Sequence, residues 1–300
     1  MKLDSVIKIA TTNNLPLLLV GKHGTGKSYS IAQAAQKAGK TLHRLIITQE
    51  TTPEDLVCQY ELKDNETQML KRALLIAAEQ GDWIVFEEIN MGSPAVLTLL
   101  NGLLETDPES RYVRFQNMEV KPHKEFRMFA TSNPTSYSGA NRMNDALLSR
   151  FLVQLVQPDY LGFLGIIKDK FDDQKIYDAA KKFLSAAQKV EKNYELYISP
   201  RELLVYAGLR ADKISHKDAI QLILGRHYDL EDDVLSDIAA LFDTEMERDN
   251  VFIINEVELK KKIDSAIEDV NSKLSQLQNE LETAKAYKEK YEKARTAFGE

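Results

Sequence analysis

The chain has 300 residues, 43% of them hydrophobic and 28% charged, which excludes a wholly disordered chain and provides apolar side chains for a sizeable core. This length is about twice the common domain size, so we expect two domains, or one domain and an extension. The 39 basic and 46 acidic residues give a net charge of −7, which predicts no overall attraction to nucleic acid or to an anionic membrane, although a local basic patch would not show in this sum.

The cysteine content and the apolar runs indicate a cytoplasmic protein. Cys58 is the only cysteine of the sequence, so no intramolecular disulfide can form. The longest apolar run, residues 15–20, is far shorter than the roughly 20 residues that a membrane-spanning helix needs. Residues 1–14 lack the apolar segment and the cleavage site of a secretory signal peptide, so we expect no such signal.

Residues 1–158 alternate short apolar runs with helical patterns, which predicts a parallel α/β sheet. Several of the runs are rich in Val, Ile and Phe, as expected for strands that are buried on both faces. The helical patterns at 28–39 and 67–81 each end at a glycine of the C-cap type. The strand-like runs are residues 15–20, 41–48, 82–88, 126–132 and 151–156.

After Pro158 the strand-like runs largely cease, and residues 159–250 are predicted to form a second, helical domain. Its clearest helical patterns cover residues 178–190, 200–211 and 232–246.

The final segment, residues 251–300, has a different pattern. From Leu259 to Phe298 there is no proline or glycine, so a single helix about 60 Å long is expected at about 1.5 Å per residue. Its apolar residues follow the 4-3-4-3 spacing of a coiled coil, which favours a coiled-coil arm over an amphipathic helix packed on its own domain. They are Ile263, Ile267, Val270, Leu274, Leu277, Leu281, Ala284, Tyr291 and Phe298, and Lys288 and Arg295 interrupt the series.

Residues 21–28, GKHGTGKS, follow the first apolar run and match the P-loop pattern GxxxxGK[ST]. Glycines let the N–H groups of such a loop and the helix N-terminus face a nucleotide phosphate. Lys27 is expected to reach the β- and γ-phosphates, and the Ser28 hydroxyl to coordinate Mg²⁺. We interpret His23 as a loop residue rather than a ligand. The residues expected around the nucleotide are Gly21, His23, Gly24, Thr25, Gly26, Lys27, Ser28 and Tyr29.

Two carboxylates follow the third apolar run, in the segment WIVFEEIN at 83–90. A nucleotide hydrolase needs such groups at the end of a buried strand beside the P-loop strand. Glu87 is expected to hold the Mg²⁺ shell through water, and Glu88 to orient and deprotonate the attacking water. Two acids after a strand are otherwise often only a solvated strand end, and the P-loop upstream favours the functional interpretation.

With these motifs the sequence resembles the AAA+ ATPases, and within them the MoxR and dynein-related branch, which includes midasin-like and chelatase-like proteins. The resemblance covers about residues 10–245 and excludes 250–300. It implies an α/β P-loop NTPase core with a five-stranded parallel sheet, a C-terminal helical lid, ATP and Mg²⁺ as cofactors, and a ring, usually hexameric, with nucleotide between subunits. The matching segments are GKHGTGKS, ITQETTPEDLVCQY, WIVFEEIN, HKEFRMFATSNP, GANRMNDALLSRF and ISPREL.

The resemblance also implies roles for single residues. Asn133 resembles sensor 1, which positions the lytic water. Arg150 resembles the arginine finger that reaches the γ-phosphate of a neighbouring subunit, and Arg142 in the same segment is the alternative finger or an accessory sensor. Arg201 resembles sensor 2, which couples the γ-phosphate to the lid. One departure is Glu87, where the family usually has Asp; we expect nucleotide binding to survive this change.

The resemblance implies a Mg²⁺- and ATP-dependent ATPase of the MoxR type that remodels a protein client. Such proteins often act with a partner that carries a von Willebrand factor A domain, or as the motor of a metal chelatase. One alternative is a nucleic-acid-linked, GTP-driven restriction translocase, although the segment FATSNP and Arg201 favour the first interpretation. Another is a nucleotide-gated assembly scaffold with weak hydrolysis, against which Glu88, Asn133, Arg150 and Arg201 together argue.

Overall fold

A computed structural model of the chain describes residues 2–63, 66–134, 143, 145–227, 230–247, 265, 267–268, 270–277, 281 and 285. The chain divides into two compact units. The first consists of Met1–Asp159 with Ile198–Val205, and the second of Tyr160–Tyr197 with Tyr206–Glu300.

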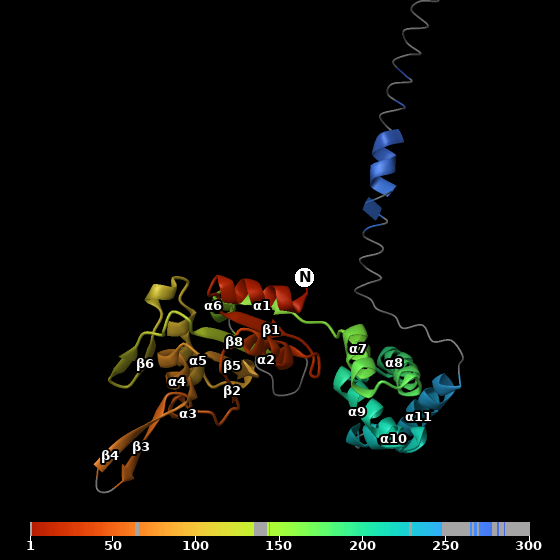
Figure 1. Cartoon of the computed structure of the whole chain (residues 1–300), viewed down its shortest axis with the longest axis horizontal. Helices are drawn as coiled ribbons and strands as arrows, with labels where there is room; N and C mark the ends of the chain where they lie inside the picture. The colour runs from red at the N-terminus through yellow and green to blue at the C-terminus, as the bar shows by residue number, and fades with distance from the viewer. Residues whose placement is uncertain are drawn as a thin grey trace, which may run out of the picture. The chain divides into compact units, whose positions relative to one another are not determined.

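A five-stranded sheet lies at the centre of the first unit (Figure 1). Its strands are β1 (Leu17–Val20), β2 (Leu42–Ile46), β5 (Trp83–Glu87), β8 (Arg127–Ser132) and β9 (Leu152–Leu155). They lie in the order β2-β5-β8-β1-β9, and every neighbouring pair is parallel. This confirms the predicted parallel α/β sheet, and each strand lies inside one of the five apolar runs.

Helices cover both faces of this sheet. On one face, α1 (Leu3–Thr12) and α2 (Lys27–Lys37) pack against Leu17 and Leu19 of β1. On the other, α4 (Ala73–Gln80) and α5 (Pro94–Asn101) belong to the same apolar cluster as Leu18. Successive residues of a strand point to opposite faces, and here both faces are buried. The central strands β1 and β5 are therefore apolar and buried along nearly their whole length. The edge strands β2 and β9 are only partly buried and carry polar residues.

The helical pattern predicted for residues 67–81 was wrong in its first part. Residues 67–71 belong to β4 (Glu66–Lys71), which pairs antiparallel with β3 (Cys58–Lys63), and the helix begins only at Ala73. The N–H of Arg72 donates to the carbonyl of Val57 at 2.8 Å, which closes the base of the hairpin. All residues of β4 are exposed, so no core contact selects a helix there. The remaining elements of the first unit are α3 (Pro53–Leu56), η1 (Ile89–Met91), η2 (Gly102–Leu104), η3 (Pro108–Ser110), β6 (Val113–Phe115), β7 (Met118–Val120) and α6 (Asp145–Leu148).

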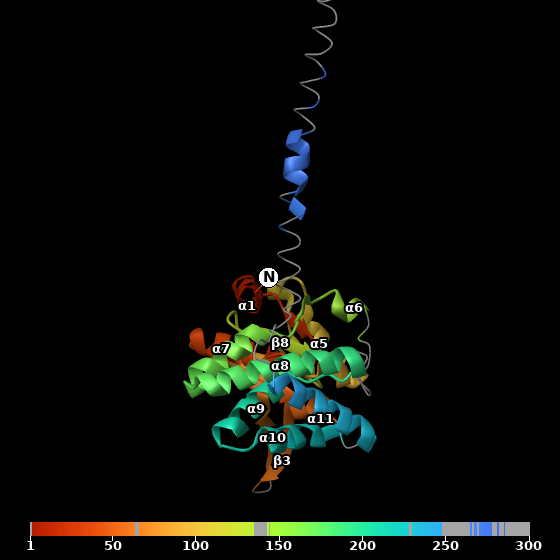
Figure 2. The same cartoon turned by 90° about the vertical axis from the view of Figure 1, so that its right-hand side faces the viewer.

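Five α-helices and the short η4 (Gly225–His227) make up the described part of the helical region (Figure 2). An aromatic core holds them together, because the ring centroid of Phe183 lies 4.5 Å from that of Tyr206 and 4.9 Å from that of Phe242. This confirms that a helical region follows the sheet. The helices are α7 (Tyr160–Phe171), α8 (Gln174–Tyr194), α9 (Pro200–Ala211), α10 (His216–Leu224) and α11 (Asp232–Met246).

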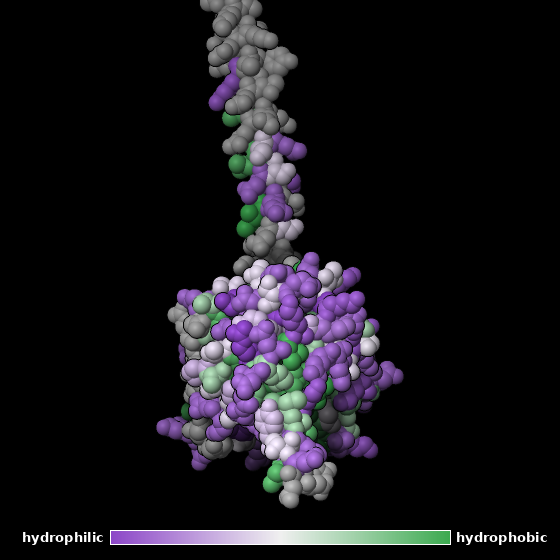
Figure 3. Space-filling model, turned by 90° about the vertical axis from the view of Figure 1, so that its left-hand side faces the viewer, coloured by the Kyte–Doolittle hydropathy of each residue, from purple (hydrophilic) through white to green (hydrophobic). Residues whose placement is uncertain are grey.

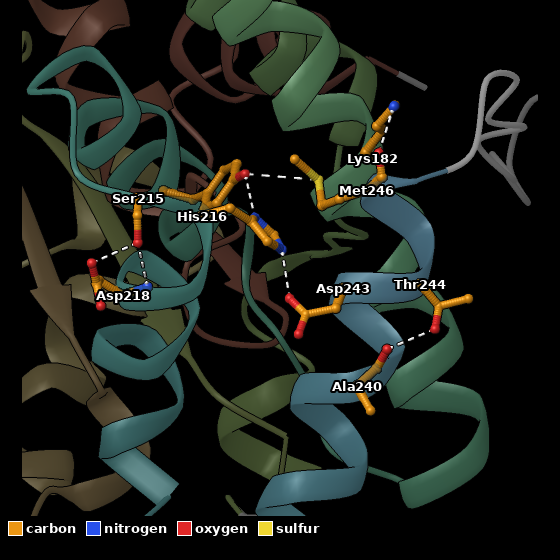
Figure 4. A network of polar contacts seen from close by, with 9 residues as sticks. Lys182, Ser215, His216, Asp218, Ala240, Asp243, Thr244 and Met246 are labelled. Atoms are coloured by element: carbon orange, nitrogen blue, oxygen red, sulfur yellow. Dashed lines mark hydrogen bonds and ion pairs between the residues drawn. The ribbon is translucent and has the colours of Figure 1, made fainter.

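A partly buried polar network connects these helices beside the aromatic core (Figure 4). The hydroxyl of Tyr206 lies 2.8 Å from Nδ1 of His216, and Nε2 of His216 lies 3.5 Å from Oδ1 of Asp243. Lys182 donates to the carbonyl of Met246 at 2.7 Å. Burial raises the pKa of Tyr206 to about 12, so its hydroxyl stays protonated and available as a hydrogen-bond donor.

The predicted arm lies mostly outside the described residues. Those that are described between 265 and 285 are helical. Five apolar side chains of the predicted series are more than half exposed, and Figure 3 shows green, apolar atoms along one side of this helical segment. They are Ile267, Val270, Leu274, Leu277 and Leu281. Within the described parts of the chain, no helix combines the length and the apolar character required to cross a membrane.

Candidate functional site

The P-loop joins β1 to α2 at the carboxyl end of the sheet. Gly24 and Gly26 have φ angles of +73° and +85°, a region that glycine occupies readily and other residues rarely do. A Cβ on Gly24 would lie 2.9 Å from Cβ of Ser199, so a side chain there would also collide with its neighbour within the first unit. The loop therefore needs glycine at position 26, which the sequence pattern fixes, and at position 24, which the pattern leaves variable. The loop leads into the N-terminus of α2, which can bind a phosphate.

Lys27, the first residue of α2, is held from three sides. Its Nζ donates to the carbonyls of Gly21 at 2.6 Å and Lys22 at 3.0 Å, and to Oδ1 of Asn133 at 3.1 Å. The residue is only 7% exposed. Burial lowers the pKa of Lys27, and Glu88 acts in the opposite direction. Lys27 is thus a largely desolvated cation in the P-loop, where phosphate oxygens are natural partners.

Glu88 directly follows β5 and has an unusual backbone conformation, with φ +56° and ψ 44°. Non-glycine residues rarely adopt this left-handed region, and such residues are often found at functional sites. Its Oε1 accepts a hydrogen bond from Nδ2 of Asn133 at 2.9 Å. Burial raises the pKa of Glu88, while Lys27 and the hydrogen bond from Asn133 partly offset that effect. A raised pKa makes the carboxylate a stronger base towards water.

Asn133 comes directly after β8 and is the link between the two charged groups. Strand β8 lies between β1 and β5, and the carboxyl ends of parallel strands meet at the same edge. The side-chain amide of Asn133 therefore lies between the P-loop and the end of β5. Its oxygen accepts a hydrogen bond from Lys27, and its nitrogen donates one to Glu88. The sequence suggested a role for Asn133 only through resemblance, and the strand order explains its position.

Glu87, the last residue of β5, has a partner that sequence reasoning missed. Arg44 donates from Nε at 2.9 Å and from Nη2 at 2.6 Å to the same oxygen, Oε1 of Glu87. A charged residue inside the otherwise mostly apolar run 41–48 was the one available signal for this contact.

The donors expected for Mg²⁺ fit that ion chemically. Ser28 is the second residue of α2, and Glu87 ends β5. Strand β5 does not lie beside the P-loop strand β1 as expected, because β8 lies between them. A hydroxyl and a carboxylate are hard oxygen ligands, and Mg²⁺ usually takes few protein ligands together with phosphate oxygens and water. Tyr29, which follows Ser28, is 60% exposed and would meet a nucleotide only at the mouth of the site.

Three arginines complete the predicted set. Arg201 lies in the 198–205 segment of the first unit; its Cβ is 3.4 Å from where a Cβ on Gly24 would stand, and its charge lowers the pKa of Lys27. Arg150 donates to Oε1 of Glu105 at 3.2 Å and to the carbonyl of Asn101 at 3.4 Å, with its side chain 38% exposed. Arg142 lies outside the described residues. The structure thus brings Arg201 to the P-loop and gives Arg150 partners elsewhere, and the roles of all three stay predictions.

Comparison with known proteins points to one family. Residues 16–151 match the model of the AAA domain of the dynein-related subfamily. Midasin of Dictyostelium discoideum is 29% identical over 152 residues, which cover 50% of this chain and 3% of midasin. The aerobic cobaltochelatase subunit CobS of a Sinorhizobium species is 28% identical over 152 residues, 47% of this chain and 46% of CobS.

Two further proteins resemble the chain over more of its length. The uncharacterized protein YojN of Bacillus subtilis is 25% identical over 188 residues, 58% of this chain and 59% of YojN. A solved structure described as a "putative ATPase" from Cytophaga hutchinsonii aligns over 83% of this chain and 89% of its own, with 14% identity and a TM-score of 0.45. The chain spans less than two thirds of the length of these curated relatives.

Proposed function

We propose that the protein is a Mg²⁺- and ATP-dependent remodelling ATPase that works as an oligomeric ring. The match of residues 16–151 to the AAA domain of the dynein-related subfamily supports this proposal. The observation that carries the proposal is the connected set Lys27, Asn133 and Glu88, which joins a phosphate-binding cation to a carboxylate of raised pKa through one amide.

Each residue of the set has a task in hydrolysis. Lys27 binds the β- and γ-phosphates, and Ser28 with Glu87 holds Mg²⁺, which supplies charge neutralisation when bound. Glu88 takes a proton from the attacking water, and Asn133 orients that water and the carboxylate. Arg201, whose charge acts on Lys27, senses the γ-phosphate.

The ring depends on Arg150 as a finger supplied to a neighbouring subunit. Its side chain is partly exposed, and its hydrogen bonds go to Asn101 and Glu105, not to P-loop residues. An exposed guanidinium is free to act across an interface in a way that a buried one is not. A hexamer with nucleotide between subunits satisfies this requirement.

The client is a protein, and the hydrolysis cycle moves the helical domain 159–250 to deform it. Similarity to CobS, which is named as a subunit of a cobaltochelatase, supports a partner protein rather than a nucleic acid, as does the net charge of −7. We propose a partner that carries a von Willebrand factor A domain as the first candidate, and residues 251–300 as a coiled-coil arm for association.

The proposal is tested by measuring nucleotide turnover of the purified chain. We expect Mg²⁺-dependent ATP hydrolysis that GTP does not replace and DNA does not stimulate, and we expect Lys27→Ala to abolish ATP binding because the phosphates lose their counter-ion. A DNA-stimulated GTPase would favour the restriction-type alternative, and ATP binding without turnover would favour the scaffold.

A further inference from the structure

The ion pair between Arg44 and Glu87 lies beside the predicted metal site. Arg44 uses two donors, Nε and Nη2, on the single oxygen Oε1, at 2.9 Å and 2.6 Å. The side chain of Glu87 is 16% exposed and that of Arg44 is 55% exposed. The glutamate is therefore held in place by a partner that reaches it from the solvent side, and its second oxygen receives no bond from Arg44.

The sheet explains why these two side chains meet. In the parallel pair β2 and β5, Ile46 lies opposite Glu87 and Arg44 lies opposite Val85. Residues 44 and 46 point to the same face of β2, so Arg44 stands one repeat away from the position opposite Glu87. An arginine side chain is long enough to cover that diagonal distance, whereas a short side chain at position 44 would not reach.

Glu87 also remains electrostatically coupled to the catalytic groups. Burial lowers the pKa of Lys27, and the negative charge of Glu87 is a smaller effect in the opposite direction. Burial raises the pKa of Glu88, and the charge of Glu87 adds to that rise. The carboxylate that Arg44 holds is thus close enough to act on the P-loop and on the proposed base. A glutamate has one more rotatable bond than the aspartate usual in the family, so it needs an additional contact to point in one direction.

We propose that Arg44 is a positioning residue that fixes the carboxylate of Glu87 through Oε1 and leaves its other oxygen, Oε2, for the Mg²⁺ shell. Arg44 does not touch the metal or the nucleotide itself. By holding the Glu87 side chain, Arg44 reduces the conformational entropy that this side chain loses when it binds the metal. The ion pair also connects the metal site to the edge strand β2. The inference rests on the proposed ATPase function and concerns the metal site of that same function.

The test is a Mg²⁺ titration of the full-length protein with a fluorescent ATP analogue bound, which measures metal binding without turnover. We expect Arg44→Ala to raise the half-saturating Mg²⁺ concentration about 10-fold, the lower range for losing a partner of a metal-binding side chain. Arg44→Lys should give a smaller increase, because an ammonium does not reproduce the two-donor geometry. Analogue binding without Mg²⁺ should be unchanged in both variants.

A double-mutant cycle with Glu87→Gln asks whether the effect passes through Glu87. In the Glu87→Gln background, Arg44→Ala should add nothing. Arg114→Ala is the matched control, because it breaks another exposed Arg–Glu pair of the first unit, Arg114 with Glu119 at 2.5 Å, and should leave the titration unchanged. Thermal unfolding of each variant shows whether it is folded. If Arg44→Ala does not fold, the titration of Arg44→Lys tests the inference instead.

Two results would overturn the inference. If Arg44→Ala and Arg44→Lys titrate like the wild type or bind Mg²⁺ more tightly, Arg44 either is irrelevant or competes with the metal for Glu87. If Arg44→Ala raises the half-saturating Mg²⁺ concentration as much in the Glu87→Gln background as in the wild type, Arg44 does not act through Glu87. A wild-type protein that binds no ATP analogue contradicts the proposed function itself, which separates that failure from this one.

Discussion

Nζ of Lys27 donates a hydrogen bond to Oδ1 of Asn133 at 3.1 Å, although 106 positions of sequence separate the two residues. The same amide donates from Nδ2 to Oε1 of Glu88 at 2.9 Å. An amide is suited to this place because it offers an acceptor to the cation and a donor to the carboxylate. A carboxylate at position 133 would satisfy Lys27 but repel Glu88.

The first prediction concerns this amide. Asn133→Ala should keep ATP binding, because Lys27 retains the carbonyls of Gly21 and Lys22, and should lower kcat about 100-fold, as loss of a positioned polar group does elsewhere. Steady-state hydrolysis and equilibrium binding measure the two effects. Asn13→Ala, which removes an exposed amide bound to the carbonyl of Ile9, is the control. Equal kcat in Asn133→Ala and the wild type would remove the amide from the mechanism.

The second prediction is the pH dependence that Glu88 imposes. Burial raises the pKa of Glu88 above 4.5, and only the ionised carboxylate can accept a proton. Activity should therefore fall as the pH decreases through that raised pKa, at a higher pH than an exposed glutamate would give. Glu88→Gln should bind ATP and lose at least about 100-fold in turnover. A kcat profile that stays flat down to pH 4.5 would show that another group is the base.

The third prediction places Arg150 at a neighbour's nucleotide. Arginine fingers contribute about 10³- to 10⁵-fold in rate, so Arg150→Ala should bind ATP normally and hydrolyse almost none. Wild-type turnover per subunit should rise with protein concentration through the assembly range. Mixing Lys27→Ala with Arg150→Ala should restore partial activity, because some interfaces then combine an intact P-loop with an intact finger. Mixed rings without recovered activity would leave Arg150 as a structural residue that binds Glu105.

The fourth prediction concerns the arm. Ile267, Val270, Leu274, Leu277 and Leu281 are each more than half exposed, and an apolar series of this period needs a partner surface. Truncation at about residue 255, beyond the last residue of α11, should leave a folded protein with a changed oligomer distribution in light scattering. If the truncated chain scatters and unfolds like the full chain, the arm does not mediate association.

The fifth prediction uses the polar network of the second unit. The pKa of His216 is lowered, first by burial and then by Arg210, while Asp243 and the backbone of Phe242 oppose the shift. The neutral imidazole is thus the native form. Below the unfolded-state pKa of 6.5 the unfolded chain binds the proton more readily, so the free energy of unfolding should fall as the pH decreases from 6.5, by at most about 1.4 kcal/mol per pH unit.

Urea unfolding at pH 7 and pH 5.5 measures this effect. It should be followed by far-UV circular dichroism, since the single tryptophan, Trp83, lies in the first unit and does not report on the second. His216→Gln should have lower stability at pH 7 and a weaker pH dependence, and His123→Gln in the first unit is the control. The same pH dependence in His216→Gln and the wild type would assign it to other groups.

The sequence by itself determined the elements whose signals are local. The P-loop pattern predicted where a phosphate would bind, because the required glycines, lysine and serine are close neighbours in the chain. The short apolar runs predicted five strands of a parallel sheet, and all five lie in one such sheet. The helix limits at 200–211 and 232–246 agree with α9 and α11, since N-terminal signals and apolar periodicity act within a few residues.

Only the tertiary structure decided what depends on pairing between distant segments. Placing β8 between β1 and β5 brings Asn133 between Lys27 and Glu88, and pairing β2 with β5 brings Arg44 to Glu87. Neither contact can be predicted from the local periodicity of the sequence. The hairpin at 58–71 was missed for a related reason, because residues 67–71 carry a pattern compatible with a helix and their state is chosen by hydrogen bonds to β3. Strand order and cross-strand pairing are properties of the whole sheet, and they are fixed only when all its strands assemble.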